Sequence, residues 1–424
     1  MEAIQTGKTM KTKNQKLGVL LLIFVSVVIN YMDRTNLSIA ASQMKEDLSL
    51  SSVQIGLLFS AFAWTYSLLQ IPGGLLADRM KIRVIYPLIM IGWSIATLIH
   101  GVVSSFLALV GLRMLVGLFE APSYPLNNKI VTSWFAEQER ASAIAIYTSG
   151  QFIGLAFAIP LLAFILEWLG WRGLFVVSGV IGIIWGAIWY YAYPKKSETQ
   201  NYISTQEPNV KTSLDFKATR NQLKLAFTSK KLWGLYIGQF CLGSTLVFFL
   251  TWFPTYLADY RGLSIVESGF YASVPFLCAF FGVLISGTFS DWLVKYGVSN
   301  EVARKTPVIA GLLLSSSAVG ANFVESTAMV TVFLSLSFFG NGLASINWIF
   351  VSLLAPKSMV GLIGGCFNFI GGLSAVIIPI AIGYLVQDGN FEPALILICF
   401  LALLGVCSFL FLVGKIEQLP EPTS

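Results

Sequence analysis

Twelve long apolar stretches dominate this sequence, and each is close to the length that an α-helix needs to cross a lipid bilayer. A span requires about 20 apolar residues, and it must be helical because lipid offers the backbone no hydrogen-bond partner. Charged residues make up 11% of the chain, against about 25% in soluble proteins. The sequence therefore predicts an all-α integral membrane protein. The predicted spans are 17–40, 53–77, 84–103, 105–128, 140–166, 172–193, 231–257, 266–290, 306–323, 327–351, 358–385 and 391–414.

A polar segment divides these spans into two sets of six. Residues 194–230 hold the run "PKKSETQNYISTQEPNVKTSLDFKATRNQ", which is too polar to cross a membrane and has room for a short surface helix. We interpret it as a cytoplasmic linker between an N-terminal six-helix bundle at 17–193 and a C-terminal six-helix bundle at 231–414. Residues 1–16 and 415–424 are predicted to be cytoplasmic tails.

The two halves carry similar turns after their second spans. Span 2 ends in "IPGGLLADRMKIR" and span 8 in "LISGTFSDWLVKYG", so Gly74 and Gly287 each lie four residues before an aspartate, Asp78 and Asp291. Matching turns of this kind indicate parallel repeats, which are found in one large class of secondary transporters. We interpret Gly74, Asp78, Arg79 and Asp291 as gating or packing residues at the membrane face and not as substrate ligands.

Lysine and arginine are strongly biased to one side of this topology. With the N-terminus inside, 22 of the 27 basic residues fall in internal loops and tails, and three fall in external loops. Because internal loops of membrane proteins are enriched in Lys and Arg, both termini are predicted to be cytoplasmic, in a multi-pass protein of the inner membrane. No small-residue cleavage site follows the first apolar stretch, so we interpret it as a retained helix and not a signal peptide.

The side chains that most enzymes use are scarce in this chain. It has one histidine, His100, which is expected to be interfacial because it lies at a span end. Its five cysteines lie in apolar segments without metal-ligand spacing, and HExxH, GxSxG and phosphate-loop motifs are missing from the sequence. We therefore predict no enzymatic activity, no metal and no cofactor. The predicted partners are the lipid bilayer and a small ligand, and no nucleic acid.

Four charged residues lie well inside the predicted spans, all in the first half: Asp33, Arg34, Arg113 and Glu120. A charge at that depth is costly and usually functional. Arg113 and Glu120 are seven residues apart, nearly two helical turns, so both project from one face, about 10 Å apart along the axis. Asp33 and Arg34 are neighbours that point about 100° apart, so they cannot pair with each other.

The four charges fit best around one wet cavity between spans 1 and 4. Pro122 and Pro125 are expected to kink or loosen span 4 just after Glu120. An arginine can bind a carboxylate through two parallel hydrogen bonds. A buried carboxyl group can exchange a proton as such a cavity opens to each side, and an anion beside the arginines would favour its protonation, which is a reciprocal coupling. The alternative is an ion-pair network that only stabilises helix packing.

Neutral polar residues within the apolar spans are the remaining candidates. Together they suit a polyhydroxylated ligand, which needs donors, acceptors and an aromatic surface. Each could instead join two helices through an interhelical hydrogen bond. The candidates are Tyr31, Tyr66, Gln151, Gln239, Ser244, Thr245, Asn341, Ser345, Asn347, Trp348, Asn368 and Ser374.

Several stretches resemble the major facilitator superfamily, and specifically its anion:cation symporter branch. In the first half they are "NYMDRTNLSIA", "SAFAWTYSLLQIPGGLLADR", "GLRMLVGLFEAPSYPLNNKIVTSWFAEQERASA" and "YTSGQFIGLA". In the second half they are "GQFCLGSTLVFFLTWFPTYL", "ARKTPVIAGLLL", "FFGNGLASINWIFVSLLAP" and "GLIGGCFNFIGGL". The resemblance implies twelve transmembrane helices in two pseudo-symmetric six-helix bundles, a self-sufficient monomer, and proton-driven import of a sugar acid of the D-galactonate type.

By motif position, the resemblance also implies roles for individual residues. Asp33 and Glu120 would be the protonatable pair, and Arg34 and Arg113 would handle the substrate carboxylate and the two acids. The residues implied to line the sugar site are Tyr31, Tyr66, Gln151, Gln239, Ser345, Trp348 and Asn368. The chain departs from the pattern of galactonate transporters at two substrate-facing positions, Val247 and Asn347, so we add Asn347 to the substrate-binding candidates and leave the sugar acid open. The alternatives are the same mechanism with glucarate, hexuronate or another organic anion, and a membrane sensor that binds without transport.

Overall fold

The computed structural model describes residues 2–135, 137–194, 216–356 and 359–421, and within that part all regular structure is helical. Eleven helical stretches are long and apolar enough to cross a membrane. One of them, Ser142–Ala192, has 51 residues and contains both the fifth and the sixth predicted span. All twelve predicted spans are therefore helical, and the expectation of an all-α membrane protein is confirmed.

The chain forms two compact units. The first comprises Met1–Ser49 and Ala61–Val210, and the second comprises Leu50–Ser60 and Lys211–Ser424. The first half of the chain holds α1 (Glu2–Asp47), α2 (Ser52–Arg79), α3 (Ile82–His100), α4 (Phe106–Glu120), α5 (Ser123–Trp134) and α6 (Glu137–Ala192). Helix α2 contributes residues to both units.

The second half of the chain begins with α7 (Phe216–Thr228), the short helix for which the predicted linker has room, and α7 packs on α8. The helices that follow are α8 (Lys230–Thr251), α9 (Phe253–Thr255), η1 (Tyr256–Tyr260), α10 (Ile265–Lys295), α11 (Asn300–Ser315), η2 (Ser316–Phe323), α12 (Thr327–Leu343), η3 (Ala344–Trp348), α13 (Ile349–Leu354), α14 (Val360–Leu385), α15 (Glu392–Cys407) and η5 (Ser408–Val413).

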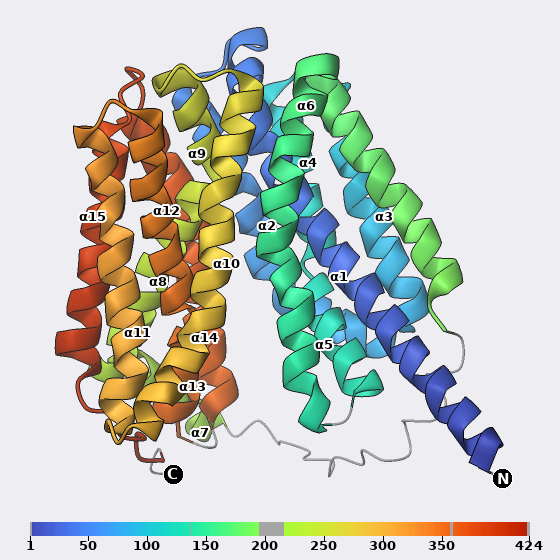
Figure 1. Cartoon of the computed structure of the whole chain (residues 1–424), viewed down its shortest axis with the longest axis vertical. Helices are drawn as coiled ribbons and strands as arrows, with labels where there is room; N and C mark the ends of the chain where they lie inside the picture. The colour runs from blue at the N-terminus through green and yellow to red at the C-terminus, as the bar shows by residue number, and fades with distance from the viewer. Residues whose placement is uncertain (1, 136, 195–215, 357–358, 422–424) are drawn as a thin grey trace. The chain divides into compact units, whose positions relative to one another are not determined.

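Within the first unit, α1 lies alongside α6, and α3 packs on both α4 and α6 (Figure 1). Helix α6 contains a sharp turn at Gly170, whose φ of 66° favours glycine because other L-residues rarely adopt it. After this turn, α6 runs antiparallel to α1: Trp171 Nε1 donates to Asp47 Oδ2 at 3.0 Å, and Trp185 Nε1 donates to Ser26 Oγ at 2.9 Å.

Span 4 is interrupted where the prolines predicted a break. Helix α4 ends at Glu120, and α5 begins at Ser123, directly after Pro122. The missing N–H and fixed φ of proline favour a helix start over a helix interior. As a result, Glu120 lies at the carboxyl end of a helix in the interior of the first unit, where it is fully buried.

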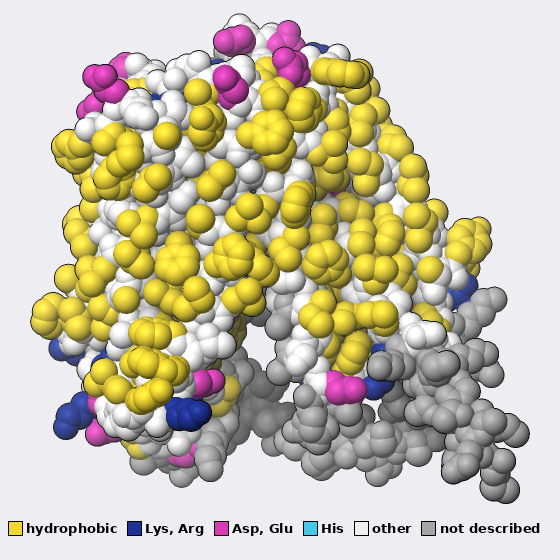
Figure 2. Space-filling view, in the orientation of Figure 1, with side chains coloured by type: hydrophobic (Ala, Val, Ile, Leu, Met, Phe, Trp, Pro, Cys, Tyr) yellow, Lys and Arg dark blue, Asp and Glu magenta, His cyan; other side chains and the backbone are white. Residues whose placement is uncertain are grey.

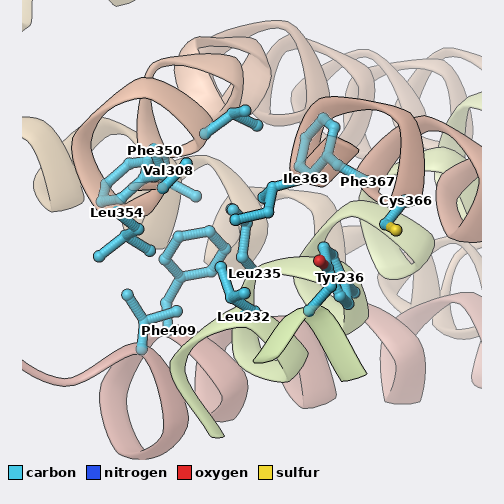
Figure 3. Packing of buried hydrophobic residues seen from close by; sticks show 14 of the residues in the cluster. Leu232, Leu235, Tyr236, Val308, Phe350, Leu354, Ile363, Cys366, Phe367 and Phe409 are labelled. Carbon is cyan, nitrogen blue, oxygen red and sulfur yellow. The ribbon is translucent and has the colours of Figure 1, made fainter. Parts of the chain in front are cut away.

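A hydrophobic cluster packs the helices of the second unit together (Figure 3). It joins Leu232 and Tyr236 of α8, Phe350 of α13 and Phe367 of α14, all buried. The C-terminal residues predicted as a tail also pack here up to Leu419, whose backbone N–H donates to the carbonyl of Leu354 at 2.9 Å. The segment packs in this way because its apolar side chains, Ile416 and Leu419, contact the cluster.

Hydrophobic side chains cover most of the middle of the helices on the face shown in Figure 2, and the visible charged side chains lie mostly at the helix ends. This distribution is expected for helices whose outer surfaces face lipid, because exposed apolar side chains replace the polar surface of a soluble protein. It agrees with the span lengths, and the chain is a multi-pass membrane protein.

Candidate functional site

The candidate site in the first unit is centred on an ion pair between α1 and α4. Arg34 Nε donates to Glu120 Oε2 at 3.0 Å. Glu120 is fully buried, whereas the Arg34 side chain is 15% exposed. A carboxylate at the carboxyl end of a helix is disfavoured by the helix dipole, so Glu120 depends on Arg34 for a compensating charge. Arg34 Nη2 and Glu120 Oε1 have no hydrogen-bond partner in the structure.

Three aromatic rings surround the Arg34 guanidinium. Its Cζ atom lies 4.8 Å from the ring centroids of Tyr31 and Phe62 and 4.6 Å from that of Tyr66. The Tyr31 hydroxyl accepts a hydrogen bond from Tyr124 at 3.3 Å. Ring faces attract a guanidinium without consuming its N–H donors. The arrangement therefore holds the arginine in place while leaving Nη2 available for an anion.

Asp33 points away from Arg34, as their adjacency predicted. It is 0% exposed, and the Trp93 indole is a donor within reach of its carboxylate, although neither oxygen forms a well-aligned hydrogen bond. The indole of Trp93 lies beside it, and Arg113 and Glu120 are within electrostatic range. A buried carboxyl group with no fixed partner is free to change its protonation state without breaking an ion pair.

Arg113 completes the set of four charges. It is 4% exposed, its guanidinium lies 5.5 Å from the Phe62 ring centroid, and its Nε has no hydrogen-bond partner. Asp33 and Glu120 both lie within its electrostatic range. The four charges that the sequence singled out therefore gather in one region of the first unit, and Arg34 makes the direct contact with Glu120.

His100, the last residue of α3, is buried inside the first unit. It is only 1% exposed, its Nδ1 lies 2.8 Å from the carbonyl oxygen of Ala96, and its ring stacks on Phe175 at 5.1 Å. The physical reason is the close packing of α3 on α6, which covers the last turn of α3. Gln151 of α6, the remaining substrate candidate in this unit, is half-buried.

The second unit holds a neutral polar group. Asn347 Nδ2 donates to Gln239 Oε1 at 3.1 Å, and Asn347 Oδ1 is buried without a partner. Asn347 lies in the 3₁₀ segment η3, which interrupts the tenth span. The exposed Trp348 contacts Phe367 edge-on at 4.9 Å. Ser345 is half-buried and Asn368 is exposed.

The predicted gating residues are described only in the second half. Asp291 Oδ1 accepts from Arg304 Nη1 at 2.6 Å, and the same Nη1 donates to Ser290 Oγ at 3.0 Å. The side chains of Gly74, Asp78 and Arg79 lie outside the described residues. Among the residues described, no group of His, Cys, Asp and Glu is arranged to hold a metal ion.

Sequence reasoning missed several side chains of the first-unit site. Phe62 carries no polar signal, although it touches both arginines. Tyr124 could have been found, because it lies four residues after Glu120, close to one helical turn. Asn30 and Trp93 are buried polar side chains that lie within hydrogen-bonding reach of Glu120 and Asp33 respectively.

Residues 23–298 match the family model of the Major Facilitator Superfamily. The chain belongs to this superfamily. It is 46% identical over 412 residues to the D-galactonate transporter of Escherichia coli O6:H1, with 94% of this chain and 96% of the relative covered. It is 40% identical over 419 residues to the probable galactarate/D-glucarate transporter GudP of Bacillus subtilis (strain 168), with 94% and 92% covered.

The fold agrees with this membership. A crystal structure of a bacterial homologue of the human lysosomal transporter Spinster matches with a TM-score of 0.74 at 20% identity, covering 94% of this chain and 96% of that one. Proteins of the major facilitator superfamily are membrane transporters. This member is therefore a transporter and not an enzyme.

Proposed function

We propose that this major facilitator protein is a proton-coupled symporter that imports a sugar acid of the D-galactonate type by alternating access. We propose that it is a monomer in the inner membrane. We propose that both termini lie in the cytoplasm, because most Lys and Arg residues fall in the loops on the same side as the termini. The 46% identity to a D-galactonate transporter supports the substrate class.

The observation that carries the proposal is that the Arg34 guanidinium has a hydrogen-bond donor without a partner. One guanidinium nitrogen holds Glu120, three rings hold the plane, and Nη2 has no partner. A carboxylate is the natural acceptor for the remaining donors, since arginine and carboxylate form paired, charge-assisted hydrogen bonds. Arg113, whose Nε is also free of hydrogen bonds, would balance the charge of the incoming anion.

Asp33 and Glu120 are proposed as the proton carriers. A substrate carboxylate that competes for Arg34 weakens its bond with Glu120, so Glu120 loses its counter-charge and binds a proton more readily. By linkage, protonation of Glu120 frees Arg34 for the substrate. Substrate and proton therefore favour each other's binding, which is the thermodynamic requirement for symport.

The hydroxyl groups of the sugar acid are proposed to bind the neutral residues. Tyr31, Tyr66 and Gln151 serve this role in the first unit. In the second unit the role falls to Gln239, Ser345, Asn347, Trp348 and Asn368. We propose that Gly74, Asp78, Arg79 and Asp291 act in gating and packing at the cytoplasmic face and do not touch the substrate.

A dicarboxylate such as glucarate is the second candidate, because relatives named as probable galactarate/D-glucarate transporters are 36 to 40% identical to this chain. Among the side chains that the structure describes, every buried charged group lies in the first unit. The second unit offers amides, hydroxyls and an indole and no buried cation for a second carboxylate. This difference favours an acid with one carboxylate.

The test is uptake by proteoliposomes that contain the purified protein. We expect D-galactonate to accumulate against its gradient when the outside is acidic, and the accumulation to collapse with a protonophore. A sodium gradient at equal pH should not replace the proton gradient. Binding without accumulation would instead identify a sensor, and stronger accumulation of glucarate would identify a dicarboxylate carrier.

A further inference from the structure

One face of α1 carries a row of residues from the buried Asp33 to the surface. Asp33, Asn36, Ala40, Gln43 and Asp47 follow the three–four spacing that places side chains on one side of a helix. Exposure falls steadily inward along the row: Asp47 is exposed, Gln43 is half-buried, and Asn36 and Asp33 are 0% exposed. At its outer end, the row reaches a pocket of about 540 Å³ that Gln43, Glu46 and Asp47 line together with α6 residues. One of these is Arg172, whose Nη2 lies 3.5 Å from Asp47 Oδ2.

Helix α6 carries a buried polar side chain, Ser178, at about the level of the middle of this row. The backbone N–H of Trp171 donates to Gln43 Oε1 at 3.1 Å, and Trp185 donates to Ser26. Ser178 lies midway between these two tryptophans on α6. Because the helices run antiparallel, the position of α1 level with Ser178 is close to Asn36. Both side chains are 0% exposed, and neither has a hydrogen-bond partner.

Helix α3 supplies the third side of this region. Trp93 lies beside Asp33, with its indole N–H within reach of that carboxylate. His100 follows Trp93 by seven residues on α3. Its Nδ1 bonds to the Ala96 carbonyl, so in the neutral ring Nδ1 carries the hydrogen and Nε2 is an acceptor. That Nε2 atom is buried and has no partner. His100 stacks on Phe175, which is about one turn from Ser178 on α6.

Buried polar groups in proteins are almost always bonded to protein or to ordered water. Here the side-chain polar atoms of Asn36 and Ser178 and the Nε2 atom of His100 are buried and unpartnered, and they are contributed by three helices of the packed first unit. A buried water typically serves about three such groups. The unpartnered groups on α1, α3 and α6 are therefore suited to hold a chain of internal water between Asp33 and the pocket at Gln43.

We propose that the first unit contains a proton route of its own, in which protons reach Asp33 from the pocket at Gln43 and Asp47 through water held by Asn36, His100 and Ser178. The proposal rests on the proposed function, because it supplies the coupling proton of the same site. In the proposed orientation, this pocket faces the outside of the cell.

The proposed route and the Arg34 guanidinium lie on different sides of α1. Arg34 projects from α1 about 100° away from Asp33 and is the partly exposed member of the set. The groups that face Asp33 are Arg113 and Glu120 of α4 and Trp93 of α3, and Arg113 is also within range of His100.

The proton balance is simple. Hydronium in the pocket gives one proton to the first water of the chain, and each water passes one O–H proton inward. The Asp33 carboxylate receives the last proton and becomes a neutral carboxylic acid. No side chain other than Asp33 needs to change its charge.

Two reactions of the full-length protein in proteoliposomes test the route. Accumulation of D-galactonate under an inward proton gradient requires proton movement, whereas exchange of labelled for unlabelled D-galactonate at equal pH on both sides does not. We expect Asn36→Leu and His100→Phe to lower the rate of accumulation by about tenfold or more and to leave exchange near the wild-type rate. Asn36→Ser, which keeps a hydroxyl for water, should recover most of the accumulation.

Thr35→Val is the matched control. Thr35 is a buried polar neighbour of Asn36 on α1, but its hydroxyl donates to the carbonyls of Tyr31 and Met32 and needs no water. This variant should keep both reactions. Accumulation at the wild-type rate by Asn36→Leu would overturn the route. The route would also be overturned if Asn36→Leu, His100→Phe and Asn36→Ser all lost both exchange and accumulation. A wild-type protein that exchanges but never accumulates would overturn the proposed symport itself.

Discussion

Replacement of Arg34 by lysine is the sharpest test of the proposed substrate site. In the structure, Arg34 uses Nε for Glu120 and keeps Nη2 for an anion. Lysine carries one ammonium group, which cannot hold Glu120 and a substrate carboxylate in the geometry of a planar fork. It also loses the flat stacking on Tyr31, Phe62 and Tyr66. We therefore expect Arg34→Lys to fold and to bind the sugar acid weakly.

The magnitude follows from the bonds that are lost. A hydrogen bond to a charged group contributes about 1.5–3 kcal/mol. If lysine forfeits one such bond to the carboxylate, the dissociation constant should rise roughly ten- to a hundredfold, since about 1.4 kcal/mol corresponds to a factor of ten. The weaker contact of an ammonium group with the three rings acts in the same direction.

Isothermal titration calorimetry with purified protein and D-galactonate measures this change. Arg83→Lys is the control, because Arg83 also lies against an aromatic ring, that of Tyr190 at 4.9 Å, but belongs to the exposed surface. A melting temperature of ligand-free Arg34→Lys close to that of the wild type would exclude unfolding as the cause. A dissociation constant within about twofold of wild type would refute the reasoning and assign Arg34 to helix packing.

Three further predictions follow from single residues. Asp33→Asn should abolish proton-driven accumulation in proteoliposomes but permit exchange, and undiminished accumulation would exclude Asp33 as a proton carrier. Asn347→Thr should change the ratio of calorimetric affinities for D-galactonate and glucarate by about tenfold or more, whereas an unchanged ratio would exclude Asn347 from substrate selection. Gly117→Ala should lower the free energy of unfolding by about 1–3 kcal/mol, because its Cβ would clash with the carbonyl oxygen of Phe62 on α2. Gly111→Ala on the same helix is the control, because its Cβ would meet nothing within 4 Å.

Much of the fold could be predicted from the sequence because the signals are local. Apolar length gave each of the twelve spans, since a bilayer imposes a minimum length on any helix that crosses it. The turn at Gly170 between the fifth and sixth spans was expected only as a gap in hydropathy, and the structure shows the positive φ that makes it a turn. The break after Glu120 followed from Pro122, whose chemistry disfavours a continuous helix.

The members of the candidate site were partly visible in the sequence. Asp33, Arg34, Arg113 and Glu120 are conspicuous because charges are rare inside apolar spans. Helix periodicity also showed that Asp33 and Arg34 must seek different partners. It could not show which acid meets which base, because that depends on how helices are rotated and how deep they lie relative to one another.

Tertiary structure alone decided those pairings. It placed Glu120 against Arg34, collected Tyr31, Phe62 and Tyr66 around one guanidinium, and put Asp33 beside the indole of Trp93 and not beside an arginine. These contacts join residues far apart in the chain, and no local rule sets their geometry. The sequence by itself determined that four charges had to be buried in the membrane-spanning part of this protein; only the packing of α1, α2, α3 and α4 decided which of them would remain available for a ligand or a proton.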